Sequence, residues 1–505
     1  MKPLHFVDTT LRDGNTSLWA QSLRTDMLLP ILDRFDRAGY QAMEIIDASF
    51  FKKGIRELNE DPWNRVRRVA AATPNTPLRV ITSRHLIFGY SPPEIDFFYL
   101  QRLAANGVRQ IRISDPSNTA SNWKLLVANA NKAGLDSILN LIFSISPVHT
   151  DKYYRKLARE AARLKPTLIC LKDPGGLLTP DRMRTLVPAV LAETGKMPVE
   201  LHTHCNTGLG PLCVLEAIKL GISIINTATP PLANGSGNPS VFNIVENAIE
   251  LGFQPSLQME EVKAISEHLW NVARAEGLPS GTPLEYTEAH YAHQIPGGMA
   301  SNFRHQLRQA GMLDRLPEVI EEVKRVRREL GYPVMVTPYS QFVGVQAVIN
   351  VMLGERYKEV SDQVLEYALG IWGAAERDAI DPDIRDRIVS RPRAREVAKW
   401  TPPDTTVAEL RRQFGGPGVD DDEMLMRYFA GIEEVKAMRA APARSGGLDV
   451  RQPLTRLIET LGKKKQFGYV RIEKNGLSIH LGRSAPVPAP EYEPDSAPAP
   501  ALKTA

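Results

Sequence analysis

Cysteine is scarce in this sequence, and long apolar runs are absent. Three cysteines (Cys170, Cys205 and Cys213) are too few for a disulfide framework, and no C-x-x-C pair is present that could hold a structural zinc ion. No run of about 18 apolar residues occurs, and the N-terminal residues lack the apolar core of a signal peptide. We therefore expect a cytoplasmic protein in a reducing environment.

An excess of charge of one sign is also missing. The 62 Lys and Arg residues nearly balance the 58 Asp and Glu residues, which leaves a net charge of +4 on 505 residues. This balance gives no sign of a nucleic-acid partner, and short basic runs such as Arg65–Arg68 are expected on solvated faces. With 43% hydrophobic and 24% charged residues, the chain can bury a large core.

The first 230 residues alternate short β-rich runs with longer amphipathic segments. Eight such runs are expected as strands: Leu4–Asp8, Met43–Asp47, Leu78–Ser83, Gln110–Ser114, Ile138–Ile145, Thr167–Lys172, Val199–His204 and Ser223–Ala228. Their spacing leaves room for one helix between successive strands, which predicts a (β/α)₈ TIM barrel of the α/β class. An open, doubly wound sheet is the alternative.

The remainder of the chain has a different pattern, and we expect four domains. A barrel over 1–255 is followed by a helical domain over 256–445, a small module over 446–483, and a disordered Ala/Pro tail over 484–505. In the helical domain, the pattern predicts helices at Val262–Ala275, Leu316–Leu330, Ser361–Leu369 and Met424–Met438. In the small module, it predicts a helix at Leu454–Leu461 and strands at Tyr469–Ile472 and Leu477–Leu481.

Polar residues at the carboxyl ends of the predicted strands indicate an active site, because barrel enzymes place their chemistry there. His202 and His204 lie two residues apart on one strand, so both imidazoles face the same way and can bind a metal. Asp8 ends the first strand and is the expected carboxylate ligand. The alternatives are a hydrogen-bonded histidine pair and an Asp8 that caps the next helix. Arg12 and Asp13 are expected either to pair with each other or to contact substrate.

Two further candidates are less easily explained from the residues alone. Lys172 ends the sixth strand, where an ammonium would repel a cation; it could be a substrate anchor, a base of low pKa, a modified ligand or a salt-bridge partner. Ser301 follows a Pro-Gly-Gly turn in residues 293–302 and could pass a proton or cap a helix. The loop at 234–239 could bind an anion or serve as a turn.

Taken together, these motifs resemble the carboxyltransferase domain shared by pyruvate carboxylase, the oxaloacetate decarboxylase α subunit and the transcarboxylase 5S subunit. The resemblance runs in order from about residue 3 to residue 440. It is carried by Asp8-Thr-Thr-Leu-Arg-Asp13, Ser17-Leu18, Arg24-Thr25, Pro62-Trp63, Gly89-Tyr90, Asp115–Asn118, Leu171-Lys-Asp-Pro-Gly-Gly-Leu-Leu178, His202-Thr-His204, Ile295-Pro-Gly-Gly-Met299, Ser301-Asn302 and Val336-Thr-Pro338.

The resemblance implies a metal-dependent barrel followed by a helical domain. It implies that Asp8, His202 and His204 bind Zn, Mn or Co, with carbamylated Lys172 as an anionic fourth ligand. It also implies that Ser301 shuttles a proton between the substrate enol and biotin. In such enzymes, carboxybiotin releases CO₂, which the enolate of a 2-oxo acid attacks; the reverse reaction decarboxylates oxaloacetate. Lys172, Ser301, Arg12 and Asp13 are the expected catalytic residues.

The substrate-binding positions depart from the family pattern. The resemblance places Tyr90, Thr16, Ser83 and Arg84 at the 2-oxo acid, but relatives carry Gln where this chain has Thr16 and Arg where it has Ser83. A serine cannot replace the bidentate clamp of a guanidinium. Pyruvate or oxaloacetate is therefore the default substrate, and another acceptor is the alternative.

Residues 454–483 resemble the beginning of a biotin carboxyl carrier protein, but the Ala/Val-Met-Lys-Met biotinylation motif is missing from this sequence. We therefore expect a separate biotin carrier, a biotin carboxylase partner for the carboxylating direction, and a homo-oligomer. The same sequence pattern allows two other functions. One is a lyase or aldolase of the same superfamily, of the 3-hydroxy-3-methylglutaryl-CoA lyase type. The other is a scaffold subunit that docks a carrier without turnover.

Overall fold

A computed structural model describes residues 2–83, 86, 91–295, 307–308, 311–401, 403–442, 469–474 and 477–482. The chain forms two compact units, Met1–Leu448 and Asp449–Ala505. Among the described residues, no helix is long and apolar enough to cross a membrane.

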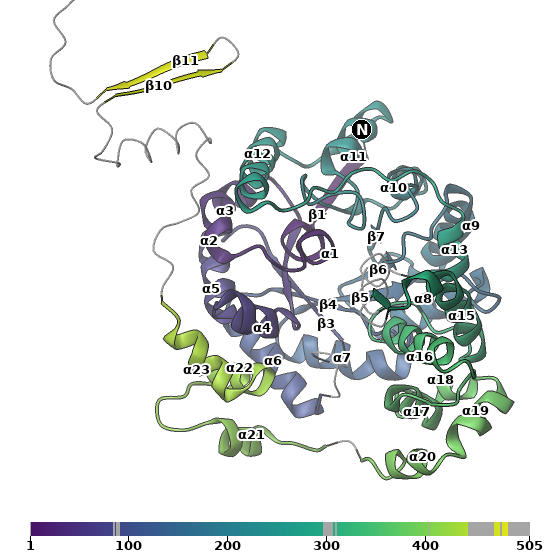
Figure 1. Ribbon diagram of the computed structural model, residues 1–505. Helices are drawn as coiled ribbons and strands as arrows, with labels where there is room; N and C mark the ends of the chain where they lie inside the picture. The colour runs from purple at the N-terminus through teal and green to yellow at the C-terminus, as the bar shows by residue number, and fades with distance from the viewer. Residues whose placement is uncertain are drawn as a thin grey trace, which may run out of the picture. The chain divides into compact units, whose positions relative to one another are not determined.

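Eight parallel strands form a closed barrel in the first unit (Figure 1). They are β1 (Lys2–Asp8), β2 (Ala42–Asp47), β3 (Leu78–Thr82), β4 (Gln110–Ile113), β5 (Asp136–Ile142), β6 (Leu168–Asp173), β7 (Val199–Thr203) and β8 (Ile224–Thr227). The sheet closes because β1 pairs with both β2 and β8. This closure confirms the TIM barrel and excludes the open, doubly wound sheet.

Helices connect the strands and surround the barrel. They are α1 (Asn15–Trp19), α2 (Thr25–Leu28), α3 (Leu32–Arg37), α4 (Phe50–Lys53), α5 (Pro62–Ala72), α6 (Pro93–Ala105), α7 (Ala120–Lys132), α8 (Asp151–Arg163), α9 (Pro180–Thr194), α10 (Gly210–Lys219) and α11 (Val241–Glu250). Several begin at a side chain that caps the first turn; the carboxylate of Asp61 caps α5 and the hydroxyls of Thr150 and Thr179 cap α8 and α9. After α11, the short strand β9 (Phe253–Pro255) pairs with the start of β1.

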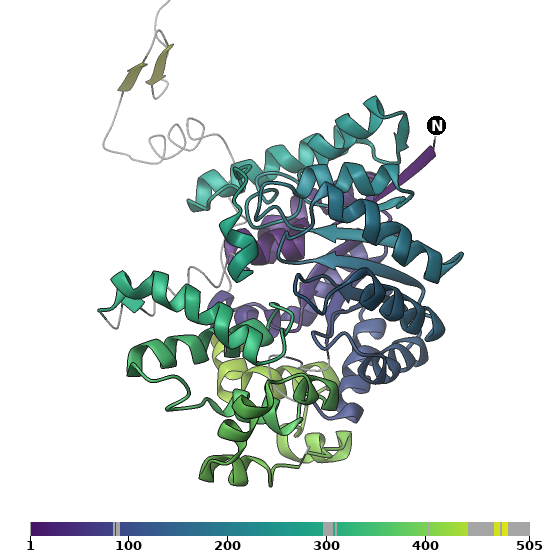
Figure 2. The same ribbon diagram turned by 90° about the vertical axis from the view of Figure 1, so that its right-hand side faces the viewer.

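The helical region follows α12 (Met259–Glu276). Its described helices are α13 (Ala289–His293), α15 (Leu316–Glu329), α16 (Tyr339–Leu353), α17 (Asp362–Leu369), α18 (Ala374–Asp378), α19 (Pro382–Val389), α20 (Pro392–Val397), α21 (Val407–Phe414), α22 (Asp421–Ala430) and α23 (Ile432–Ala440). In its core, tilted and edge-to-face ring contacts join four aromatic residues: Tyr339, Phe342, Tyr367 and Trp372. Figure 2 shows the helices between α15 and α20 gathered on one side of the barrel.

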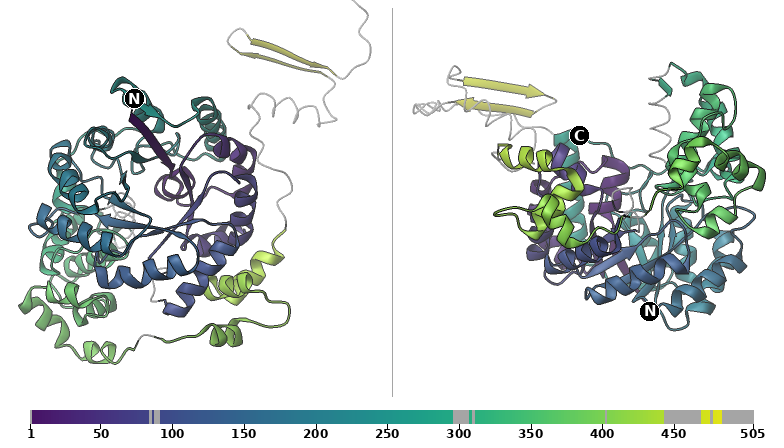
Figure 3. Two further views of the ribbon diagram at one scale, coloured as in Figure 1. Left: turned by 180° about the vertical axis from the view of Figure 1, so that it is seen from behind. Right: turned by 90° about the horizontal axis from the view of Figure 1, so that it is seen from below.

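The last helices of this region return to the outside of the barrel, beside α4 and α6 (Figures 1 and 3). The Asp422 carboxylate accepts hydrogen bonds from Arg67 and Arg102, and the Asp422 carbonyl accepts one from Trp63. The single helix expected over Met424–Met438 is wrong: Gly431, with φ of 110°, separates α22 from α23.

The second unit contains an antiparallel hairpin of β10 (Tyr469–Lys474) and β11 (Leu477–Gly482). Both strands are those expected from the sequence. The predicted helix Leu454–Leu461 and the tail 484–505 lie outside the described residues.

Candidate active site

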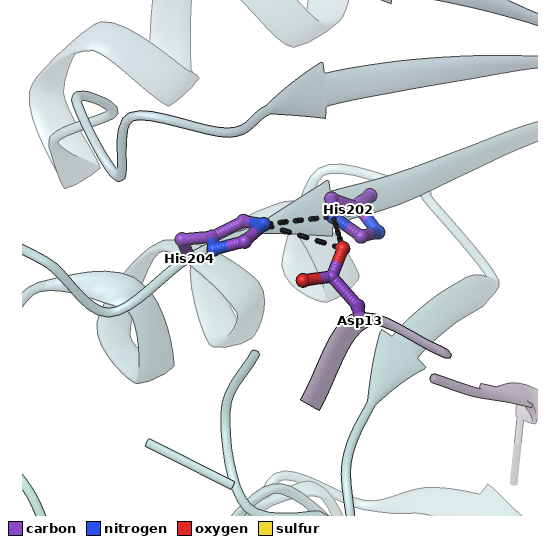
Figure 4. A group of neighbouring side chains, drawn as sticks. All are labelled: Asp13, His202 and His204. Carbon is purple, nitrogen blue, oxygen red and sulfur yellow. Dashed lines mark hydrogen bonds and ion pairs between the residues drawn. The ribbon is translucent and has the colours of Figure 1, made fainter. Parts of the chain in front are cut away.

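Three buried side chains meet at the carboxyl end of the barrel (Figure 4). Asp13 Oδ2 lies 3.2 Å from His202 Nε2 and 3.4 Å from His204 Nε2, and the two Nε2 atoms are 3.2 Å apart. One ligand atom from each residue lies within 4.8 Å of the others. Two imidazoles and a carboxylate at this spacing can serve three positions of one divalent cation.

The carboxylate in this group is that of Asp13, whereas the sequence pattern favours Asp8. The structure does not bring Asp8 to the histidines: its carboxylate accepts hydrogen bonds from the backbone N–H and the hydroxyl of Thr10, and burial raises its pKa to about 7. After β1 the chain makes a wide turn at Thr10–Gly14 (η1), with Gly14 N–H bonded to Thr9 O over 3.0 Å. This turn, which a regular strand-to-helix connection would not contain, carries Asp13 into the site.

Hydrogen bonds on the far side of each imidazole fix its orientation. His204 Nδ1–H donates to the Ser236 carbonyl over 2.6 Å, which turns Nε2 toward Asp13. His202 Nδ1 lies 3.0 Å from Asn226 Oδ1 and 3.0 Å from an Nη of Arg112. Ser236 belongs to the 234–239 loop, so this loop contributes an acceptor to the site.

Burial and the Asp13 charge act in opposite directions on the two histidines. Burial lowers the pKa of His202 to about 3. Burial also disfavours the imidazolium of His204, but the adjacent Asp13 carboxylate more than offsets it and raises the pKa of His204. Burial likewise disfavours the Asp13 carboxylate, yet Arg12 and His204 hold the pKa of Asp13 well below its usual range.

Arg12 is held by two carboxylates. Its guanidinium lies 2.8 Å from Asp13 and donates to Glu44 over 2.9 Å from Nε and 2.5 Å from Nη2. The expected pairing of Arg12 with Asp13 is present, and Glu44, at the centre of β2, is an added partner. Burial disfavours the Glu44 carboxylate, but the guanidiniums of Arg112 and Arg12 outweigh it and lower the pKa of Glu44 to about 2.

A cavity of about 280 Å³ opens beside this cluster. Barrel residues and the segment before α16 enclose it; its lining is Arg12, Asp13, Thr16, Ser17, Lys172, Pro174, His204, Asn206, Ser236, Met335, Val336 and Thr337. Lys172, at the end of β6, lies with its Nζ 3.3 Å from Ser114 Oγ. Burial, reinforced by the charge of Arg12, lowers the pKa of Lys172 to about 8. The cavity thus brings together candidates from β6, β7, the turn after β1 and the helical region.

Of the predicted substrate-binding residues, the structure places one in the lining of the cavity. Thr16 lines the cavity, and its hydroxyl donates to the Arg12 carbonyl over 2.6 Å. Ser83 follows β3 and is absent from the described lining of the cavity. Arg84, Tyr90 and Ser301 lie outside the described residues.

Charged side chains that were not among the predicted site residues fill the barrel below the histidines. Glu44, Arg79, Arg112 and Glu200 stand on β2, β3, β4 and β7, and none of them is exposed to solvent. A signal is present in the sequence, because each has an apolar residue on both sides within its strand. Charged residues in the middle of barrel strands must pair inside the barrel.

The donor set is suited to a divalent metal such as zinc, manganese or cobalt. Imidazole nitrogen and carboxylate oxygen suit these ions. The Ser236 carbonyl supports His204 in the way that acceptors behind metal-binding histidines commonly do.

Family models match two parts of the chain. One, described as the conserved carboxylase domain, matches residues 291–438, and another, described as HMGL-like, matches residues 104–269. The carboxylase match covers the helical region, and the HMGL-like match covers the second half of the barrel and the start of α12.

Curated relatives match over most of the chain. A pyruvate carboxylase subunit of Methanocaldococcus jannaschii is 32% identical over 96% of this chain and 87% of the relative. The methylmalonyl-CoA carboxyltransferase 5S subunit of Propionibacterium freudenreichii subsp. shermanii is 31% identical over 85% of this chain and 86% of the relative. The 2-oxoglutarate carboxylase large subunit of Hydrogenobacter thermophilus is 30% identical over 91% of this chain and 71% of the relative.

Among solved structures, the carboxyl transferase domain of Rhizobium etli pyruvate carboxylase, determined with pyruvate, has the same fold. It superposes with a TM-score of 0.78 at 22% identity, over 87% of this chain and 76% of that one. On the evidence of its sequence relatives and the carboxylase-domain match, this chain belongs to the family of biotin-dependent carboxylases and carboxyltransferases.

Proposed function

We propose that this chain transfers a carboxyl group between carboxybiotin on a carrier and the enolate of a 2-oxo acid, with pyruvate and oxaloacetate as the default pair. One observation carries the proposal: Asp13, His202 and His204 converge within 4.8 Å beside a cavity that Arg12 and Lys172 also line. The family relation supplies the reaction class, and this cluster supplies a place for it.

Asp13, His202 and His204 would hold a divalent metal, Zn, Mn or Co. Lys172 is the proposed fourth ligand, as a carbamate formed when its amine adds CO₂ and releases a proton. The bound metal would polarise the carbonyl oxygen of the 2-oxo acid and stabilise negative charge there. Asp13 replaces Asp8 in this ligand set because the Asp8 carboxylate is bonded to Thr10.

Arg12 is positioned to stabilise the enolate. It lines the cavity, and its two carboxylate partners fix its orientation before substrate arrives, which is the condition for effective electrostatic catalysis. Ser301 is proposed to carry the proton from the methyl group of the 2-oxo acid to the biotin nitrogen that has lost CO₂. The new C–C bond then forms between the enolate carbon and CO₂.

Thr16 bears on the choice of substrate. Its hydroxyl hydrogen is used on the Arg12 carbonyl, so it cannot also donate to a substrate carboxylate. A family relative named for 2-oxoglutarate indicates that the carboxylated acid differs among relatives. We propose that Thr16, with Met335 and Val336 elsewhere in the cavity lining, sets which 2-oxo acid is accepted.

A biotin carrier and a biotin carboxylase are the proposed partners, and self-association remains a prediction.

The lyase alternative is supported by the barrel alone, because the HMGL-like match ends at residue 269. The carboxylase-domain match over 291–438 covers a region outside that lyase match and favours the carboxyltransferase.

The test is biotin-stimulated decarboxylation of oxaloacetate by the purified full chain, supplied in turn with Zn²⁺, Mn²⁺ and Co²⁺. We expect turnover in wild type, its loss in Lys172→Ala, and wild-type turnover in the matched control Lys219→Ala, whose side chain is half exposed at the end of α10. Oxaloacetate turnover that is unaffected by Lys172→Ala would refute the proposed site. Turnover of another 2-oxo acid alone would overturn the default substrate and retain the site.

A further inference from the structure

Six charged side chains of alternating sign run across the inside of the barrel and end at the proposed metal ligands. In order they are Arg79, Glu200, Arg112, Glu44, Arg12 and Asp13. Three positive and three negative groups balance, and each is at least nine-tenths buried. Paired in this way, each charge offsets the desolvation of its neighbours.

Arg112, on β4, is the branch point of this chain of charges. One Nη lies 2.7 Å from Glu44 Oε1 and 3.0 Å from His202 Nδ1. The other contacts the Glu200 carboxylate and donates to Asn226 Oδ1 over 2.6 Å. A single guanidinium thus contacts Glu44, which holds Arg12, and also His202 and its neighbour Asn226.

These contacts of Arg112 support two parts of the site, the guanidinium of Arg12 and the proposed metal ligand His202. Through Glu44, Arg112 fixes the carboxylate that orients Arg12. On the other side, the two Nη groups place Arg112 itself and the Asn226 amide oxygen each 3.0 Å from His202 Nδ1, which fixes the ring with Nε2 toward Asp13 and His204.

We propose that Arg112 is a positioning residue that sets the geometry of the metal ligand His202 and of Arg12 together. This inference rests on the proposed metal site. Arg112 does not line the described cavity; it acts on Arg12 through Glu44, and on His202 both directly and through Asn226. Lysine would keep the charge but not the planar fork that spans four partners.

Arg79 offers a matched control in the same barrel. It is as fully buried as Arg112 and shares the partner Glu200, 2.8 Å away, and its other nitrogens bond to Gln110. A substitution of Arg79 therefore disturbs the same network from the end that is farther from His202 and Asn226.

The experiment compares full-length wild type, Arg112→Lys and Arg79→Lys. Co²⁺ affinity is measured by competition with a chromophoric chelator, the Co²⁺ absorption spectrum reports ligand geometry, and melting temperature reports stability. We expect Arg112→Lys to bind Co²⁺ roughly 10 to 100 times more weakly with an altered spectrum, as substitutions behind metal ligands commonly do. Arg79→Lys should lose thermal stability while keeping the wild-type spectrum and an affinity within about twofold of wild type.

The outcomes separate the two proposals. If wild type binds Co²⁺ and Arg112→Lys binds it equally well, or if both variants weaken binding to the same degree, Arg112 has no specific positioning role. If wild type binds no Co²⁺, Zn²⁺ or Mn²⁺, the metal site itself fails and this inference falls with it. Should Arg112→Lys not fold, Asn226→Ala keeps every charge of the network and must still weaken Co²⁺ binding; unchanged affinity there would overturn the inference.

Discussion

Glu44→Gln should lower the free energy of unfolding strongly, although the two side chains have nearly the same shape. The carboxylate is fully buried between the guanidiniums of Arg12 and Arg112, and the substitution removes its charge while keeping its shape. A pKa of about 2 in place of 4.5 corresponds to about 3 kcal/mol of folding free energy at neutral pH. This value agrees with the cost of about 3–5 kcal/mol that is typical when one partner of a buried ion pair is removed.

The pH dependence follows from the sign of the shift. Because the pKa of Glu44 is lower in the folded chain, its contribution is complete above about pH 5 and is lost as the pH falls through the unfolded value toward the folded one. The difference in unfolding free energy between wild type and Glu44→Gln should therefore be about 3 kcal/mol at pH 7 and less than half of that near pH 3.

Urea denaturation followed by circular dichroism measures both values. The matched control is Glu318→Gln: this glutamate pairs with Arg315 on the exposed side of α15, and the arginine also lowers its pKa. Water screens that pair, so little change is expected. Equal effects of the two substitutions, or a Glu44→Gln effect that does not vary with pH, would show that burial of the ion pair is not the cause.

Three further predictions concern other parts of the structure. His149 is buried and its pKa is lowered to about 3, so protonation of its imidazole opposes folding. Between pH 6.5 and pH 5, the free energy of unfolding of wild type should therefore fall by about 2 kcal/mol more than that of His149→Gln. Urea denaturation at the two pH values measures this difference. Gly431→Ala forces a non-glycine residue to φ of 110° and should cost about 1–3 kcal/mol by the same method, more than Gly354→Ala, where φ is 68° and a Cβ meets nothing within 4 Å. Thr16→Gln adds an amide donor at the cavity and should lower the KM for oxaloacetate roughly tenfold in steady-state assays; an unchanged KM would exclude this position from substrate contact.

Much of the fold could be predicted because its signals are local. Each barrel strand is a short apolar run of β-favouring residues, and the predicted starts and ends fall within a few residues of those in the structure. Over 424–438 the apolar period passes through Gly431 without interruption and therefore predicts one continuous helix. Only the backbone conformation at that glycine divides it.

The candidate site could be predicted only in part, for reasons of geometry. His202 and His204 were identified because strand alternation fixes their common direction. The pattern favours Asp8 over Asp13 because Asp8 ends a strand, and the turn at Thr10–Gly14 that brings Asp13 inward has no periodic signal in the sequence. The sequence pattern does not indicate Arg112, because its partners come from strands far apart in the chain, a relation that only the closed barrel creates.

The most direct test of the proposed active site is the metal content of the purified chain. Mass spectrometry would measure it for wild type, Asp13→Asn and Asp8→Asn. We predict about one Zn, Mn or Co per chain in wild type and in Asp8→Asn, because Asp8 bonds to Thr10 and lies outside the ligand group. Asp13→Asn, which removes one of the three clustered ligands, should lose the metal. A stoichiometric metal retained in Asp13→Asn but lost in Asp8→Asn would contradict the site as described.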